Sequence, residues 1–351
     1  MSGFKVSIVM PVYNAEDSIR DAIESILGQD MCLDDIEVIF VDDCSSDGSV
    51  SIIREYCERF SNFRLVCLEE NVGAAYGPRN VGLKYASGDF IMFLDSDDCF
   101  HSNACELLYD AISRDDSVDL VFARYCRFYP DKGLRLKGYS PYNDFISEYE
   151  DDIYSGAQFK GVYKFLWKYL LRRLVYGSKK DANNFNITIR DIKDYKEIFK
   201  ILPSIWTKIY RTSFIKEHNL EFPSFISGED LNFVVESYFL ADTIVFLNEY
   251  IIHDYYMRDM SITKNITYPL VYDSLDSYYN ACKICREYGF KESNILLNPF
   301  LLNWINLYRQ SNLNKDEKKE LYSLANDMGE IFNNGLLSRF LIGFIKLLLK
   351  F

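Results

Sequence analysis

The sequence lacks the basic face by which proteins usually meet nucleic acids. No stripe of Lys and Arg is visible, and the 39 basic residues are outnumbered by 52 acidic ones, which gives a formal net charge of −13. Because a nucleic-acid-binding domain needs a basic surface against the phosphate backbone, nucleic acid is excluded as a partner.

Two glycine-rich phosphate-binding motifs are also missing. No Gly-x-x-x-x-Gly-Lys-Ser/Thr occurs, and no Gly-x-Gly-x-x-Gly follows the first predicted strand at residues 6–12. Their absence argues against a P-loop protein and against a dinucleotide-binding domain. A nucleotide bound by this chain would therefore be held by side chains and a metal ion.

Paired cysteine motifs are scarce. The nine cysteines are odd in number and mostly lie in apolar runs, and no signal peptide is visible before the first predicted strand. This pattern predicts reduced thiols in the cytoplasm. Cys282 and Cys285 form a single Cys-x-x-Cys on a predicted helix, and without a second pair no zinc site is predicted there.

What is present is an alternation of strands and helices over the first 130 residues. Apolar runs predict strands at 6–12, 37–41, 64–68 and 90–94, and helical periodicity predicts helices at 19–27, 50–60 and 74–86. Asn14 is placed to cap the first helix. The alternation predicts an α/β domain with a mostly parallel sheet covered by helices on both faces.

The remainder of the chain is predicted to carry a variable insertion and a helical end. Residues 131–200 do not continue the alternation of strands and helices, and this insertion is predicted to shape the site. A strand-like run follows at 243–256. Residues 266–335 are predicted to form a helical module, followed by a tail helix at 336–351. The domain prediction is therefore 1–265, 266–335 and 336–351.

Four polar clusters follow four predicted strands. They lie at residues 11–14, 42–43, 71–79 and 95–98. In open α/β sheets ligands bind beyond the carboxyl ends of the strands, so these clusters are expected to meet in one cleft.

The cluster Asp95-Ser96-Asp97-Asp98 comes directly after the apolar run 90–94. Ending a buried strand in three carboxylates is costly without a counter-ion. A hard divalent cation that bridges the carboxylates to a diphosphate would relieve this cost. The alternative is a solvated acidic turn that caps the next helix.

In combination these motifs resemble those of the family 2 glycosyltransferases of the GT-A fold. The resemblance covers roughly residues 5–265 and rests on Pro-Val-Tyr-Asn at 11–14, Val-Asp-Asp-Cys-Ser-Ser-Asp-Gly-Ser at 41–49, Asn-Val-Gly at 71–73 with Arg79-Asn80 and Gly82, Leu-Asp-Ser-Asp-Asp at 94–98, Trp-Thr-Lys-Ile-Tyr at 206–210 and Gly-Glu-Asp at 228–230. It implies a Rossmann-like sheet and an inverting, metal-dependent transfer of a hexosyl or N-acetylhexosaminyl group from a UDP-sugar. The implied acceptor is a hydroxyl of a glycan or lipid-linked molecule in cell-surface polysaccharide synthesis.

The resemblance also assigns donor-binding residues. The loop implied to pack on the nucleotide is Pro11, Val12, Tyr13 and Asn14. Asp42 would accept the uracil N3–H, which suits an acceptor-only carboxylate; its alternative is a tight turn. Arg79 would reach the diphosphate, its alternative being a surface salt bridge. Asp95 and Ser96 would lie near the ribose, and Lys208 near the diphosphate unless it only packs. Cys44 stands where the family often has glycine, so the turn is expected to differ slightly.

Further residues receive metal and catalytic roles by the same resemblance. Asp97 would hold Mn²⁺ or Mg²⁺, which would neutralise charge on the departing diphosphate. His253 is either a further metal ligand or a structural residue, and Asp98 is expected to cap the following helix. Asp230 aligns with the general base, its alternative being an N-cap of a helix at 231–240, and Glu229 is the next candidate base.

The tail at 336–351 contains eleven Leu, Ile and Phe residues and a basic face. That face comprises Arg339, Lys346 and Lys350, together with Gly343. Sixteen helical residues are too few to span a bilayer, so the pattern predicts peripheral contact with the inner face of the cell membrane. The alternative is a helix docked on this chain or on a second subunit.

Two rival functions remain open. A nucleotidyltransferase with a related sheet would need a glycine-rich basic loop after the first strand, and residues 11–14 provide none. An inactive sugar-binding scaffold would be expected to lack Asp97 or Asp230, and both are present.

Overall fold

The computed structural model describes residues 3–129, 133–138, 187–191, 198–199, 204–256, 266–290, 298–331, 343, 345–346 and 349. The chain divides into two compact units. The first comprises residues 1–137, 184–195 and 203–264, and the second comprises residues 138–183, 196–202 and 265–351. Most of the predicted insertion at 131–200, including a helix expected near 165–175, lies outside the described residues.

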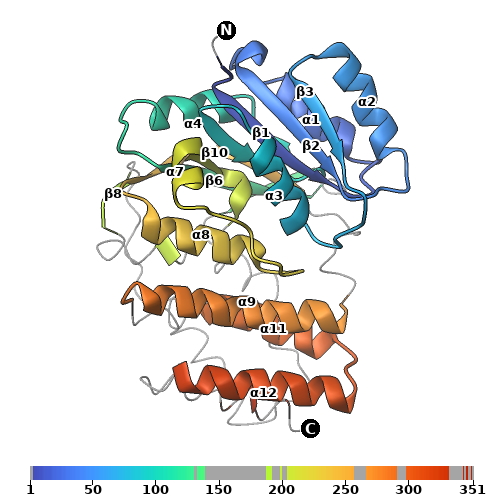
Figure 1. Ribbon diagram of the computed structural model, residues 1–351, viewed down its shortest axis with the longest axis vertical. Helices are drawn as coiled ribbons and strands as arrows, with labels where there is room; N and C mark the ends of the chain where they lie inside the picture. Colours follow the sequence, from blue (N-terminus) through green and yellow to red (C-terminus); the bar gives the residue numbers. More distant parts are fainter. Residues whose placement is uncertain are drawn as a thin grey trace. The chain divides into compact units, whose positions relative to one another are not determined.

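The first unit is built on a sheet whose described strands run in the order β3-β2-β1-β4-β9-β6-β10-β5 (Figure 1). The strands are β1 (Val6–Val12), β2 (Ile36–Asp42), β3 (Phe63–Cys67), β4 (Phe90–Phe93), β5 (Cys99–Phe100), β6 (Leu120–Tyr129), β7 (Leu134–Gly138), β8 (Ile187–Ile189), β9 (Lys208–Arg211) and β10 (Ile244–Tyr256). Strands β3, β2, β1 and β4 are parallel, which confirms the four predicted strands. The other half is mixed, because β9 runs antiparallel to both β4 and β6.

Six described helices belong to the first unit. They are α1 (Ile19–Leu27), α2 (Ser49–Arg59), α3 (Tyr76–Tyr85), α4 (Ala104–Ile112), α7 (Thr212–Glu217) and α8 (Glu229–Leu240). Helix α1 buries Ile19, Ala22, Ile23 and Ile26, the stripe that its periodicity predicted. The predicted capping role of Asn14 is wrong, because Ser18 occupies the N-cap and Asn14 has a φ of 47°.

Helix α3 lies unusually close to the sheet at Gly82. The helix packs on β1 and β2. A Cβ atom on Gly82 would lie only 2.3 Å from Cγ1 of Val9 in β1. Arg79 stands three residues earlier and is also buried, so it shares the sheet-facing side of the helix.

The parallel strands bring their carboxyl ends to one edge. Val12 pairs with Asp42, and Asp42 pairs with Cys67, so the loops after β1, β2 and β3 start level with one another. Strand β4 runs parallel to β1 and leads into the acidic cluster at 95–98. The polar clusters therefore meet at this edge, as expected.

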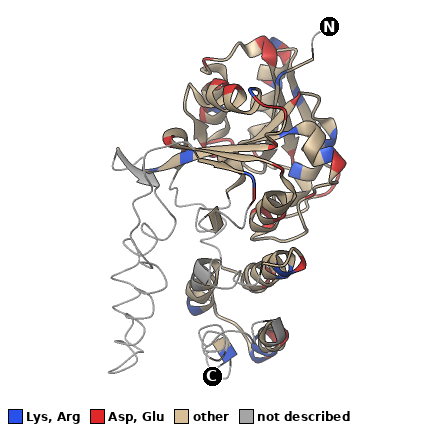
Figure 2. Cartoon of the chain, turned by 90° about the vertical axis from the view of Figure 1, so that its left-hand side faces the viewer, with Lys and Arg blue, Asp and Glu red and all other residues tan. Residues whose placement is uncertain are grey.

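Charged residues are interspersed over the first unit. In Figure 2 red and blue positions alternate over its helices and loops, and no side in that view is uniformly basic. In the described part of the first unit the acidic residues are therefore spread over many positions.

The second unit contains the helices α9 (Tyr268–Glu287), α11 (Asn298–Gln310) and α12 (Lys315–Ile331). Both α11 and α12 pack on α9. Trp304 is fully buried, and its indole N–H donates to the carbonyl oxygen of Val271 at 2.8 Å. Cys282 and Cys285 are buried on α9. These helices fall within the helical module predicted at 266–335.

The tail is described at four positions only. Gly343, Ile345, Lys346 and Leu349 are helical, and Arg339 and Lys350 lie outside the described residues. Ile345 is 0% exposed and Leu349 is 5% exposed. Burial of these apolar side chains favours a docked helix over one that faces lipid. Among the described helices, none is both long and apolar enough to cross a membrane.

Candidate active site

Arg79 joins three carboxylates that are far apart in the sequence. Its Nη1 donates to Glu229 Oε1 at 2.9 Å and to Asp230 Oδ1 at 2.7 Å. Its Nη2 donates to Asp95 Oδ1 at 2.7 Å. The three acidic residues come from the loop after β4 and from the first turn of α8, so the cluster ties these two segments to α3.

The charges in this cluster are unbalanced. One guanidinium, only 4% exposed, faces three carboxylates. Burial and then the neighbouring Asp230 raise the pKa of Glu229 to about 7, and burial also raises the pKa of Asp230. Burial alone would lower the pKa of Arg79, but the three carboxylates raise it above its usual value. The arrangement thus contains carboxyl groups that are suited to holding or accepting a proton.

Asp98 anchors the acidic loop to β10. Its Oδ2 lies 2.9 Å from His253 Nε2, and its Oδ1 accepts the backbone N–H of Tyr256 at 2.9 Å. Asp98 therefore does not cap α4, whose N-cap is Asn103. The prediction of a capping role for Asp98 is wrong, because the long-range partner on β10 takes its carboxylate.

His253 is fully enclosed. Its ring stacks on Trp206 with a centroid distance of 4.1 Å, and burial lowers its pKa to about 3. The imidazole is therefore neutral at ordinary pH. With Nε2 facing Asp98, the other ring nitrogen, Nδ1, is buried and has no hydrogen-bond partner. Nδ1 is therefore the ring nitrogen that could bind the predicted metal ion.

The metal prediction concerned Asp97 and His253. Within the described part of the chain, no group of three or more His, Cys, Asp or Glu side chains converges to form a metal site. Asp97 lies close enough to His253 to influence its pKa, as does Asp95. A cation at this edge would therefore depend on few protein ligands.

Asp42 offers an open acceptor at the nucleotide side of the site. The residue is 2% exposed, and its Oδ2 accepts the N–H of Ser45 at 3.1 Å. Its Oδ1 is buried without a hydrogen-bond partner. Since an unpaired buried acceptor is costly, this oxygen is suited to a ligand donor.

Asp43 has a structural role that the sequence did not reveal. Its two oxygens accept the N–H groups of Val72 and Gly73 at 2.7 and 3.0 Å. The carboxylate thus fixes the loop at 71–73 against the end of β2. The turn formed by Asp42 and Asp43 therefore leaves only one of their four oxygens, Asp42 Oδ1, buried and unpaired.

The loop after β1 is braced by the loop after β2. Asn14 Oδ1 accepts the N–H of Ser46 at 2.8 Å, and the N–H of Asn14 donates to Ser45 Oγ at 2.9 Å. Tyr13 is 51% exposed beside them, while Pro11 and Val12 are buried in β1. An exposed aromatic ring at this position could stack on a flat ligand.

Cys44 adopts the backbone conformation that glycine would favour. Its φ is 61°, in the left-handed region. The thiol donates to the carbonyl oxygen of Leu68 at 3.1 Å. The backbone at this position therefore keeps a glycine-like conformation despite the added side chain.

Lys208 and Trp206 are interior residues. Lys208 is 0% exposed, and its ammonium donates to Ser204 O and Thr207 Oγ1. Burial lowers its pKa to about 7, while nearby Asp230 acts in the opposite direction. Trp206 packs between His253 and Tyr255. Ser96, beside Asp95, is partly exposed.

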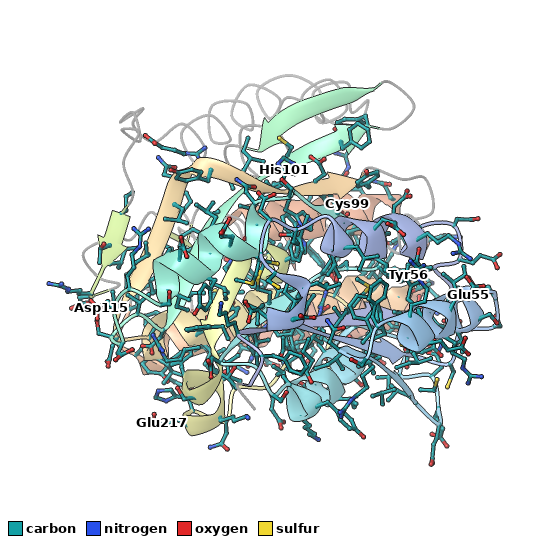
Figure 3. The ribbon with its side chains drawn as sticks, turned by 90° about the horizontal axis from the view of Figure 1, so that it is seen from above. Glu55, Tyr56, Cys99, His101, Asp115 and Glu217 are labelled. Atoms are coloured by element: carbon teal, nitrogen blue, oxygen red, sulfur yellow. The ribbon has the colours of Figure 1, made fainter. Side chains whose placement is uncertain are left out.

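His101 also makes a structural contact. It lies near Cys99 (Figure 3), and its Nε2 is 3.0 Å from Asp254 Oδ1. The contact gives His101 a structural role. The contact strengthens the attachment of the segment after the acidic loop to β10.

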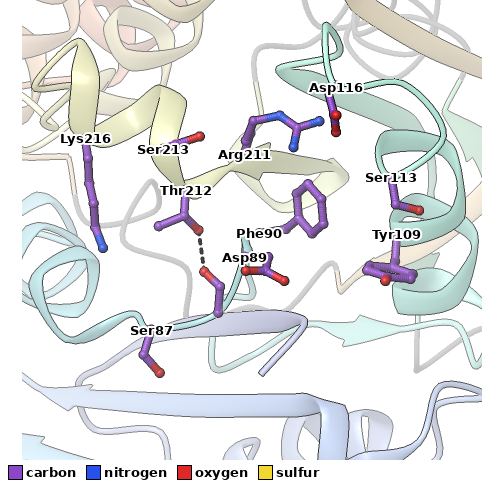
Figure 4. A pocket seen from close by; sticks show the side chains of 11 residues that line it. Ser87, Asp89, Phe90, Tyr109, Ser113, Asp116, Arg211, Thr212, Ser213 and Lys216 are labelled. Carbon is purple, nitrogen blue, oxygen red and sulfur yellow. Dashed lines mark hydrogen bonds between the residues drawn. The ribbon is translucent and has the colours of Figure 1, made fainter. Parts of the chain in front are cut away.

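A cavity of about 530 Å³ lies at the opposite edge of the sheet (Figure 4). Phe90, at the beginning of β4, and Arg211, at the end of antiparallel β9, form part of its lining. Thr212 Oγ1 donates to Gly88 O at 2.7 Å beneath it. The cavity therefore belongs to the amino ends of the parallel strands and not to the carboxylate cluster.

Known proteins resemble this chain in sequence and in fold. A sequence model described as glycosyl transferase family 2 matches residues 7–187. The chain is 30% identical over 253 residues to the poly(ribitol-phosphate) beta-glucosyltransferase of Bacillus spizizenii, covering 72% of this chain and 32% of the relative. The chain thus spans about a third of the length of the curated relatives that it first matches.

Two solved structures show the same fold. One is TarS 1–349 of Staphylococcus aureus in complex with UDP-GlcNAc, with a TM-score of 0.67, 21% identity, and coverage of 99% of this chain and 89% of that chain. The other is the mannosyltransferase PcManGT of Pyrobaculum calidifontis in complex with GDP-Man and Mn²⁺, with a TM-score of 0.53, 14% identity, and coverage of 99% and 88%.

Proposed function

Because the chain belongs to glycosyl transferase family 2, we propose that it transfers a sugar from a UDP-sugar to a hydroxyl of a cell-surface polysaccharide or its lipid-linked precursor. Its fold is the GT-A fold of the TarS structures, as the sequence predicted. The observation that carries the proposal is the Arg79 cluster. It holds Asp95, from the loop assigned to the donor, and Asp230, the candidate base, on one guanidinium.

In the proposed reaction Asp230 takes the proton of the acceptor hydroxyl. The acceptor oxygen attacks the anomeric carbon while the bond from that carbon to the UDP oxygen breaks. A single displacement inverts the configuration, so an α-linked donor gives a β-linked product. Arg79 and the backbone N–H of Ile205 both stabilise the ionised form of Asp230, and the side chain is 24% exposed, so an ionised carboxylate is accessible to the acceptor hydroxyl.

The donor base is proposed to be uracil. Asp42 Oδ1 is a buried acceptor without a partner, and uracil presents an N3–H donor of the required kind. The exposed ring of Tyr13 and the braced Asn14 would flank the base. A TarS structure contains UDP-GlcNAc, and the Bacillus relative is named a glucosyltransferase, which supports a hexosyl or N-acetylhexosaminyl donor.

Mn²⁺ or Mg²⁺ fits the acidic loop by the chemistry of its donors. Asp97 offers a hard oxygen ligand, and His253 Nδ1 is a buried nitrogen without a partner. Magnesium-type sites commonly combine one or two carboxylates with substrate phosphates and water, so Asp97 would be sufficient as the protein carboxylate. When bound, the cation supplies Lewis-acid neutralisation of the leaving diphosphate. The PcManGT structure contains Mn²⁺, which supports this assignment.

The proposed location is the cytoplasmic side of the cell membrane. A lipid-linked acceptor could there present its hydroxyl to Asp230. Burial of Ile345 and Leu349 favours docking of the tail at 336–351 on the protein, and peripheral attachment of this tail to the membrane is the alternative.

A panel of UDP-sugars tests the function. The purified chain is incubated with each sugar, with and without an acceptor polymer, and release of UDP is measured with Mn²⁺ or with EDTA. We expect UDP release from one donor, loss of activity in EDTA and recovery on adding Mn²⁺. No turnover with any UDP-sugar would contradict the proposal. Formation of pyrophosphate from UTP and a sugar phosphate would instead indicate a nucleotidyltransferase.

A further inference from the structure

Glu229 and Asp230 share a single nitrogen of Arg79. Glu229 Oε1 and Asp230 Oδ1 lie 2.9 and 2.7 Å from Nη1, which has two hydrogens and can donate one to each. Their carboxyl groups therefore lie on the same side of the guanidinium. Asp95 occupies the other terminal nitrogen. The guanidinium donates to only one oxygen of each carboxylate. Neither Glu229 nor Asp230 therefore forms a two-oxygen (bidentate) pair with Arg79.

The two carboxyl groups are not equally exposed. The side chain of Glu229 is 12% exposed, against 24% for Asp230 and 27% for Asp95. Because loss of hydration disfavours a charge, ionisation is most costly at Glu229. The charged groups facing the pair are Arg79 from α3, Asp95 from the loop after β4, and Lys208 from β9, which acts on Asp230.

From this geometry we propose that Glu229 is a positioning residue that carries a proton in the resting site, so that Asp230 stays ionised on Arg79. The inference deepens the proposed function and rests on it, because it takes Asp230 as the base. One cation then faces two carboxylates in place of three. Glu229 in its neutral form holds the guanidinium in place without competing for its charge.

The electrostatics of the site agree with this division. The pKa of Glu229 is raised to about 7, with burial the main cause and Asp230 the next. For Asp230, Arg79 and Lys208 partly oppose the effect of burial on the pKa. Two neighbouring carboxyl groups whose environments differ in this way take different protonation roles.

The proposed protonation of Glu229 makes turnover depend on pH. As pH rises through about 7, Glu229 releases its proton to solvent, and its carboxylate then competes with Asp230 for Nη1 of Arg79. Turnover should fall over this range even though Asp230 itself remains ionised. Affinity for UDP should change little, because neither carboxylate lies on the nucleotide side.

Two substitutions test whether the neutral form of the Glu229 side chain is sufficient for its role. Glu229→Ala removes one of the three partners of Arg79 and should lower kcat by about 10- to 100-fold, with a much smaller effect on the donor KM. Glu229→Gln resembles the protonated carboxyl group and should recover most of that loss. The fall in kcat between about pH 6 and about pH 8 should become shallower in the glutamine variant, and any fall that remains reports Lys208, whose pKa burial also lowers to about 7. Glu217→Gln, at an exposed position at the end of α7 (Figure 3), is the matched control.

A titration gives a readout that does not depend on activity. In protein labelled with ¹³C at the glutamate carboxyl, one resonance should titrate near pH 7 and be absent from Glu229→Gln. If no such resonance exists, or if the glutamine variant is as inactive as the alanine variant, the inference is wrong. Normal turnover of Asp230→Asn would show that Asp230 is not the base, which contradicts the proposed function. The resonance would still show whether Glu229 is protonated near pH 7.

Discussion

Asp98 and His253 are 155 positions apart in the sequence, yet a carboxylate oxygen of one lies 2.9 Å from a ring nitrogen of the other. Both side chains are 0% exposed. The contact joins the acidic loop after β4 to the carboxyl-terminal part of β10. The position of Asp95 and Asp97 is therefore set by a buried polar pair and not by the loop alone.

Replacing His253 by alanine should destabilise the protein. The change removes the imidazole that lies 2.9 Å from the buried Asp98 carboxylate and the ring that stacks on Trp206. Because the imidazole is neutral, the loss is that of a hydrogen bond to a charged group, about 1.5–3 kcal/mol, and the lost ring packing adds to it. Urea unfolding measures the change, and His218→Ala, at an exposed position, should stay within about 0.5 kcal/mol of the parent. Equal stability of the two variants would contradict the anchoring role.

Replacing Asp42 by asparagine should weaken binding of UDP. Ser45 already donates to one oxygen, so an asparagine must turn its NH₂ group toward either Ser45 or the nucleobase. Two donors then face each other, which costs roughly 1–3 kcal/mol, or about 5- to 150-fold in affinity. Calorimetric titration with UDP and with CDP measures the two affinities. Since cytosine N3 is an acceptor, the preference for UDP over CDP should narrow; an unchanged preference would place the base elsewhere.

Replacing Asp230 by asparagine should impair catalysis but spare nucleotide binding. The side chain keeps its shape but can no longer accept the acceptor proton. We expect kcat to fall by about 10²–10⁴. Initial rates with saturating donor give kcat, and calorimetric titration with UDP provides the internal control. Turnover close to that of the parent would transfer the base role to another group, with Glu229 the first candidate.

Removing residues 336–351 should lower the stability of the protein. Ile345 and Leu349 are buried, so truncation exposes the apolar surface that they cover. Thermal unfolding of the full chain and of the chain ending at 335 measures the effect. In parallel, co-sedimentation with anionic liposomes should be equal for the two chains if the helix is docked. Strong sedimentation of the full chain alone, with no loss of stability, would support the membrane interpretation.

The strand ends could be predicted from sequence because they depend on local periodicity. The apolar runs gave β1 to β4 within about two residues, and parallel pairing then placed Asp42 and Asp95 at one edge. The acidic cluster and the Gly-Glu-Asp motif lie in segments that the fold brings together on Arg79. The α/β fold followed from their order.

The contacts within the site could not be predicted in this way. Arg79 was expected to reach a diphosphate, but its partners Glu229 and Asp230 are 150 and 151 positions away and meet it only through packing of α3 and α8 near the same sheet edge. Asn14 resembled a helix cap by spacing. It instead braces Ser46, a contact between two loops that no local pattern encodes.

The close contact between Gly82 and Val9 has a consequence for how this protein can vary. A methyl group at position 82 would have to occupy space 2.3 Å from a side chain of the central strand, so α3 would be forced outward. Arg79, one turn earlier, would move with the helix, and its hydrogen bonds to the three carboxylates would lengthen together. A purely apolar substitution, remote from any reacting atom, could thus silence the enzyme while the sheet still assembles. At position 82 a substitution that the fold accepts can therefore still abolish catalysis.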